Sequence, residues 1–151
     1  MSTQNDYADI ASKAWDEVQE IKLLPVGSYL LTCRGGSIQA PKSADGSSSA
    51  MFTYEVSEAM DDVDMAELGA DYDLSGNRIF ARFWLKDAND LNRLRKHILA
   101  HGVDVKGMSI DESIKVCKNM QVVAYINTRN YTTADGNAVT ENVANNFQQP
   151  A

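Results

Sequence analysis

Hydrophobic and polar residues alternate over several stretches of the chain, and this period of two is typical of half-buried strands. The clearest stretch covers 78–86, where apolar residues occupy the odd positions and charged or aromatic residues the even ones. Related patterns predict four further strands, at 27–34, 51–58, 120–131 and 138–147. Gly35 and Gly36 follow the first of these strands and predict a bulge or sharp bend there.

A period of three to four predicts helices in three other places. Residues 7–23 place apolar side chains on one face, with Asp6 as the N-cap and Pro25 beyond the end. Asp87 is the expected cap of a second helix over 88–101. Ser109 and Glu112 form a capping-box pattern that opens a shorter helix reaching residue 118.

The order of these elements predicts an α+β protein that is mainly β. Five strands with the helices between the third and the fourth match the five-stranded Greek-key barrel of the OB-fold. We divide the chain into an N-terminal helical extension (1–23), an OB-fold domain (24–147) and a frayed C-terminus (148–151). Polar loops between strands one and two and between strands four and five would border the binding face of such a barrel.

The third strand carries the most informative chemistry. If Ile79, Ala81, Phe83 and Leu85 face the core, the opposite face exposes Arg78, Phe80, Arg82, Trp84 and Lys86. Single-stranded nucleic acid binds to such a surface, because bases stack on aromatic rings while cations follow the phosphates. The alternative is structural, with Phe80 and Trp84 packed under the N-terminal helix or against a dimer partner.

Further candidates for the same surface come from the other strands. On the fourth strand, Tyr125, Arg129 and Tyr131 share the face opposite the apolar positions, and Arg34 ends the first strand. Tyr125 has an equally good interpretation as a core tyrosine whose hydroxyl reaches the rim. Arg34 has an alternative as an ordinary surface arginine.

The charge is unevenly distributed along the chain. The formal net charge is −7, but residues 1–73 hold 14 of the 21 acidic residues and 4 of the 14 basic ones. Net acidity argues against a general polyanion binder, while the basic second half leaves room for a local anion-binding surface. We expect Cys33 and Cys117 to be buried thiols in a reducing compartment. With no apolar run near the length of a membrane span and no signal sequence, we expect a cytoplasmic protein without a membrane partner.

Motifs for catalysis or metal binding are incomplete. His97 and His101 have a spacing that can bind zinc, but no third ligand accompanies them, so we expect surface or helix-end histidines. Residues 71–76 match half of a calcium loop, yet its twelfth position is Arg82 instead of glutamate. The acidic segment 59–77 leaves one enzymatic alternative, a small metal-dependent hydrolase. We expect a non-enzymatic protein that needs no cofactor.

Several segments together resemble one family. These are 24–29 (LPVGSY), 52–56 (FTYEV), 78–85 (RIFARFWL), 91–95 (LNRLR) and 102–104 (GVD). In this order they are similar to phage-encoded single-stranded DNA-binding proteins with an OB-fold, over roughly 24–147. Many single-stranded DNA-binding proteins end in an acidic tail that recruits replication enzymes, whereas no acid follows Glu141 here.

The resemblance implies binding of single-stranded DNA with little sequence preference, protecting exposed strands during phage DNA replication or recombination in the host cytoplasm. We expect a homo-oligomer or cooperative self-association along the strand, with replication proteins as further partners. The site residues rest on the strand-face argument and not on the resemblance. The alternative is a structural or interaction protein of a virus particle that uses the same aromatic and basic face as a subunit interface.

Overall fold

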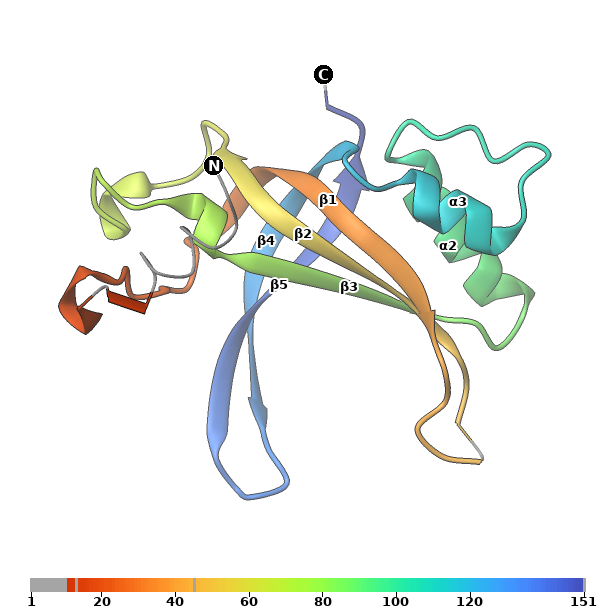
Figure 1. Cartoon of the computed structure of the whole chain (residues 1–151), viewed down its shortest axis with the longest axis horizontal. Helices are drawn as coiled ribbons and strands as arrows, with labels where there is room; N and C mark the ends of the chain where they lie inside the picture. Colours follow the sequence, from red (N-terminus) through yellow and green to blue (C-terminus); the bar gives the residue numbers. More distant parts are fainter. Residues whose placement is uncertain (1–10, 13, 45, 151) are drawn as a thin grey trace.

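Five antiparallel strands form one sheet in the computed structural model, which describes residues 11–12, 14–44 and 46–150 (Figure 1). The strands are β1 (Gly27–Gln39), β2 (Ser49–Ala59), β3 (Arg78–Trp84), β4 (Gln121–Thr132) and β5 (Ala138–Gln148). They lie in the order β3-β2-β1-β4-β5. All five predicted strands are confirmed, and the ladder between β1 and β2 shifts register between Cys33 and Gly35, where the glycine pair predicts a bulge.

The sheet is open, where the sequence predicts a barrel. Strands β3 and β5 are its two edges, and within the described part of the chain no ladder joins them. A second irregularity lies at the end of β5, where the β4–β5 ladder shifts register between Val123 and Tyr125. Asn146 takes a left-handed conformation there (φ 54°), which asparagine tolerates better than most residues. Phe147, the next residue, packs partly buried against the core.

Two helices stand between β3 and β4, as predicted: α2 (Ala88–Leu99) and α3 (Ile110–Val116). The Asp87 carboxylate accepts the backbone N–H of Asp90, and the Ser109 hydroxyl accepts that of Glu112. Short 3₁₀ turns lie at η1 (Trp15–Glu17), η2 (Met65–Glu67) and η3 (Leu74–Gly76). Among the described residues, no helix has both the length and the apolar character needed to cross a membrane.

The predicted N-terminal helix over 7–23 is wrong in its second half. Residues 7–10 and 13 lie outside the described residues, Val18 is extended, and residues 18–26 form no helix. The reason is tertiary hydrogen bonding, which replaces the bonds of a helix. The Lys22 N–H donates to the Tyr72 hydroxyl (2.9 Å), and the Asn77 side-chain amide donates to the Lys22 carbonyl (2.8 Å). The segment then enters the core at Leu24, which is buried.

The core lies on one face of the sheet, because buried and outward-facing side chains alternate along the strands. Its strand residues include Tyr29, Leu31, Cys33, Phe52, Tyr54, Val56, Ile79, Val122, Ala124 and Ile126. Helix α3 packs closely on β1 at Gly36, where a β-carbon would lie 2.8 Å from the Ile114 Cγ2 atom. Cys33 and Cys117 are both buried free thiols, as expected.

His97 and His101 lie at the C-terminal end of α2, one of the two predicted alternatives, but both are buried in this core, so the alternative of surface histidines is wrong. The Tyr54 hydroxyl lies 2.5 Å from His97 Nε2 and 2.9 Å from His101 Nε2. His101 Nδ1 also lies 2.8 Å from the His97 carbonyl, to which it donates. The rings of Phe52 and Phe147 pack against His97 at centroid distances of 4.8 and 4.5 Å. This hydrogen-bonded group ties α2 to β2 and satisfies polar atoms that the core would otherwise leave unpaired.

Burial makes both histidines hard to protonate. It lowers the pKa of His97 to about 3, with the neighbouring His101 adding to the effect, and it also lowers the pKa of His101. In the unfolded chain both imidazoles bind a proton near pH 6.5. The unfolded state therefore binds more protons than the folded one below that pH, and folding weakens as the pH falls.

We expect the free energy of unfolding to be greatest above pH 6.5 and to fall from there toward pH 3, by about 1.4 kcal/mol per pH unit for His97, with His101 adding to the fall. His97→Phe keeps the aromatic packing and removes one titrating group. The variant should therefore lose less free energy of unfolding between pH 7 and pH 5 than the wild type does. Urea denaturation followed by circular dichroism at both pH values measures this. Equal losses in the two proteins would contradict the role of His97.

Candidate functional site

A cleft of about 1250 Å³ runs along the gap between the edge strands β3 and β5. Strand β3 contributes Arg78 and the residues from Phe80 to Phe83, and β5 contributes the run from Thr140 to Phe147. The extended residues Ile21, Lys22 and Leu23 line it as well, and so do Asn77, Met51, Lys96, His97 and Arg129. Because the lining includes both faces of β3, the cleft wraps around the open edge of that strand.

The outer face of β3 carries exposed aromatic rings, as the sequence predicts. Ile79 and Ala81 are buried, so the residues between them point outward. Phe80 is 60% exposed and Trp84 is 46% exposed, which excludes packing of either ring in the core of the chain. The Arg82 guanidinium lies 5.5 Å from the centre of the Trp84 ring, within reach of a cation–π interaction. Arg82 and Trp84 therefore form one continuous cationic and aromatic surface.

The cleft has a strong excess of positive charge. Five cationic side chains line it: Lys22, Arg78, Arg82, Lys96 and Arg129. Among the described lining residues the one carboxylate is that of Glu141. A concave surface of this kind concentrates the field of its charges, so it attracts anions even though the whole chain is acidic.

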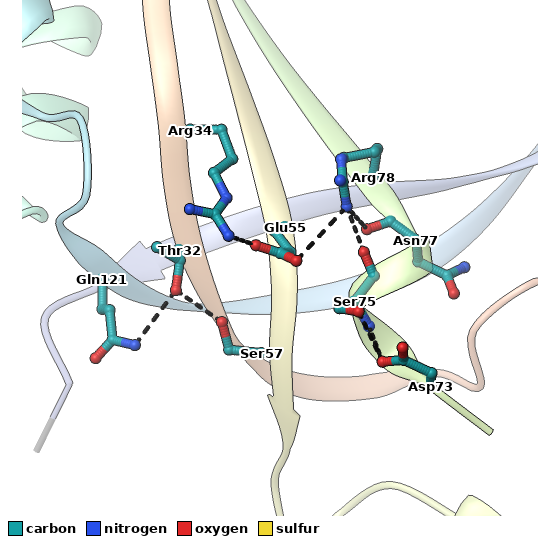
Figure 2. Close-up of polar contacts among 9 residues, drawn as sticks. All are labelled: Thr32, Arg34, Glu55, Ser57, Asp73, Ser75, Asn77, Arg78 and Gln121. Carbon is teal, nitrogen blue, oxygen red and sulfur yellow. Dashed lines mark hydrogen bonds and ion pairs between the residues drawn. The ribbon is translucent and has the colours of Figure 1, made fainter. Parts of the chain in front are cut away.

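Two of the predicted arginines share a carboxylate on the outer face of the sheet (Figure 2). Glu55 on β2 forms ion pairs with Arg34 on β1 and with Arg78 on β3, the latter at 4.0 Å. Figure 2 also shows a second polar row, in which Thr32 hydrogen-bonds to Ser57 at 2.7 Å. The cluster of Arg34, Arg78 and Glu55 thus keeps a single net positive charge on the polar outer surface of these strands.

The hairpin of β4 and β5 brings a further arginine to the cleft. Arg129 and Glu141 are direct partners in the β4–β5 ladder, and their side chains form an ion pair. The Arg129 guanidinium also lies 5.7 Å from the centre of the Tyr131 ring. The hairpin therefore repeats the combination of an arginine and an aromatic ring found on β3.

The structure brings four of the nine predicted site residues together in the cleft: Arg78, Phe80, Arg82 and Arg129. Trp84 adjoins the cleft through its contact with Arg82, and Tyr131 does so through Arg129. The other three lie elsewhere: Lys86 beyond the end of β3, Tyr125 opposite Ser28 of β1, and Arg34 beside Glu55. Tyr125 is 37% exposed, so its interpretation as a core tyrosine is not supported.

Several lining residues were missed by the sequence reasoning. Lys22 was assigned to a helix, and the segment that contains it is extended along the cleft instead. The β5 side chains Asn142, Asn145 and Asn146 add amide groups to the wall. Their signal in the sequence is the amide-rich run 142–149, whose side chains can donate to phosphates and can both donate to and accept from bases.

The acidic insertion 59–77 lies against the N-terminal segment and contributes no carboxylate to the described wall of the cleft. The Ser28 backbone N–H and hydroxyl donate to the Asp62 carboxylate at 2.9 and 3.0 Å, and the backbone bond in particular lowers the pKa of Asp62. The Gln19 side-chain amide donates to the Asp73 carbonyl at 3.0 Å. The insertion thus has a visible structural role, which is to hold residues 19–28 in place.

Comparisons with known proteins assign no family to this cleft. No family model matches the chain, and no curated protein matches it at a significant level. In the described ranges, no group of three or more His, Cys, Asp or Glu side chains is placed so that it could hold a metal ion. The chemistry of the cleft is therefore argued from its own residues.

Asn142 fixes the N-terminal segment to β5 at the wall of the cleft. Its side-chain oxygen accepts the Leu24 N–H (2.9 Å), and its amide donates to the Leu24 carbonyl (3.1 Å). Asn142→Ala leaves two backbone groups of a buried residue unpaired, so we expect a loss of about 1–3 kcal/mol in the free energy of unfolding. Urea denaturation measures it. Asn145→Ala, an exposed neighbour on the same strand, is the control, and equal losses would contradict the role of Asn142.

Proposed function

We propose that this chain binds single-stranded DNA with little sequence preference, along the outer face of β3 and the cleft between β3 and β5. The observation that carries the proposal is the alternation on β3 of exposed aromatic rings with arginines, at the rim of a positively charged cleft. Phe80 and Trp84 stack bases, and Arg78 and Arg82 bind phosphates. Arg129 and Tyr131 extend this surface onto the hairpin.

Single strands fit this surface better than duplexes do. The bases of a single strand are free to leave their neighbours and stack on a protein ring, which contributes about 1–3 kcal/mol per base. Duplex bases are already stacked on one another, so the exposed rings of Phe80 and Trp84 gain nothing from them. Stacking is also tolerant of sequence, because every base has a π-face.

We further propose that the open sheet is an OB-fold, a partly open five-stranded barrel. Three features support this: the strand order β3-β2-β1-β4-β5, the helices between β3 and β4, and the position of the hairpin loops. In Figure 1 the loop between β1 and β2 and the loop between β4 and β5 both extend toward the bottom of the view. In OB-folds these two loops and the β2–β3 face bind oligonucleotides.

The proposed biological role is that of a non-enzymatic protein that binds single-stranded DNA. We propose that the protein is phage-encoded, in line with the resemblance of its sequence segments, and that it protects exposed strands in the host cytoplasm during replication or recombination. One OB domain covers roughly 4–16 nucleotides, so useful affinity requires a homo-oligomer or cooperative association along the strand. Replication proteins are its proposed further partners.

Substitutions at the two rings test the proposal. Phe80→Leu keeps apolar area but removes the flat ring, and Trp84→Ala removes the larger ring. Each should weaken binding of a labelled oligothymidylate by about 5- to 100-fold, the equivalent of one lost stacking contact. Fluorescence anisotropy measures the affinities. Leu91→Ala, an exposed apolar residue on α2, is the control and should bind like the wild type.

Alanine variants of Arg82 and Trp84 separate the proposal from a subunit interface in a virus particle. An interface built on Arg82 and Trp84 would lose assembly when these residues are replaced by alanine, which sedimentation velocity detects. Unchanged DNA affinity together with lost assembly would overturn the proposal in favour of the interface. Weaker DNA binding by a protein with unchanged assembly would support it.

A further inference from the structure

The ion pair between Arg129 and Glu141 lies within the proposed DNA site. The two residues are direct partners in the β4–β5 ladder, and both line the cleft. The carboxylate of Glu141 therefore stands in a wall that is otherwise cationic. A phosphate that enters the cleft next to Arg129 also comes close to this negative charge.

The stability of the fold does not require this pair. The Arg129 side chain is 61% exposed and the Glu141 side chain 37%, and exposed ion pairs contribute little to folding because water and salt screen them. The hairpin already has the backbone ladder from Asn127 to Thr132 to hold its strands together. A carboxylate at this position thus has its main effect on what the arginine can bind.

A phosphate and a carboxylate compete for the same groups on Arg129. The guanidinium presents its N–H donors in a planar fork that suits either anion, and a pair with one leaves fewer donors for the other. Tyr131 lies next to the same guanidinium, which keeps Arg129 at the wall of the cleft. Arg129 is therefore well placed for a phosphate, and Glu141 neutralises it in the free protein.

We infer that Glu141 competes with the phosphates of a bound strand for Arg129 and so keeps the affinity of the cleft below what its cations would give. This inference rests on the proposed function. A protein that coats exposed strands must also leave them, and an internal competitor shortens the lifetime of the complex. Glu141 would then be a residue that tunes affinity, without stacking on a base or binding a phosphate itself.

The test compares Glu141→Gln with Asp135→Asn in binding to an oligothymidylate of about 16 nucleotides, the upper site size of one OB domain. Both variants remove one negative charge from the hairpin. Asp135 lies in the turn between β4 and β5, outside the lining of the cleft, and the resulting Asn-Gly pair suits such a turn. At low salt we expect Glu141→Gln to bind about three- to tenfold tighter than Asp135→Asn, with a slope of log affinity against log salt steeper by about 0.7, the value of one further phosphate contact.

Arg129→Gln, alone and combined with Glu141→Gln, completes a double-mutant cycle. It should weaken binding only slightly in the wild-type background, and once Arg129 is absent Glu141→Gln should give no more gain than Asp135→Asn, which is the general effect of one lost negative charge. Equal gains from Glu141→Gln and Asp135→Asn would overturn the inference, since they would show only a general field effect. Weaker binding by Glu141→Gln would also overturn it, because Glu141 would then position Arg129 for the phosphate.

The experiment distinguishes a failure of the proposed function from a failure of this inference. Absence of oligothymidylate binding by the wild-type protein would overturn both. Normal wild-type binding with no special effect of Glu141→Gln would overturn only the role of Glu141.

Discussion

The burial of Ile79 and Ala81 is the constraint on which the site depends. Successive side chains of a strand point to opposite faces, so packing these two residues in the core forces Phe80 and Arg82 outward and places Arg78 and Trp84 on the same face. A shift of β3 by one residue would bury the arginines without partners and expose the apolar positions, which is costly in both respects. The register of β3 against β2, with Phe80 opposite Thr53, is therefore fixed by the core, and the aromatic and cationic outer face follows from it.

The distribution of charge shows how an acidic chain can present a cationic cleft. Carboxylates of the insertion 59–77 have hydrogen-bond partners within the fold. Asp62 accepts two hydrogen bonds from Ser28, and Asp73 caps a short turn by accepting the Ser75 N–H. They lie away from the described wall of the cleft, where cations from β3, β4, α2 and the N-terminal segment converge. Net charge is thus a poor guide to what a surface binds, because anions respond to the local field within about 10 Å at ordinary salt.

Local patterns were enough to predict the five strands, the helices α2 and α3 and the outer face of β3. The strands, the caps at Asp87 and Ser109, and the outward direction of Phe80 and Trp84 each depend on a few neighbouring residues. The contacts that the patterns did not reveal are all long-range. Lys22 is extended because Tyr72 and Asn77 bind its backbone, and His97 is buried because Tyr54 of another element supplies its partner. The gap between β3 and β5, and the pairing of Arg129 with Glu141 beside it, likewise depend on how the strands curve in space.

Tryptophan fluorescence tests the central claim most directly. In a Trp15→Phe variant the emission comes from Trp84 alone, since the chain has two tryptophans. We expect titration with an oligothymidylate to quench this emission, and the apparent affinity to fall when the salt concentration is raised, because a base stacks on the ring beside phosphate-binding arginines. A duplex of the same length should leave the emission nearly unchanged. Unchanged emission with the single strand, or equal quenching by the duplex, would contradict single-strand stacking on β3.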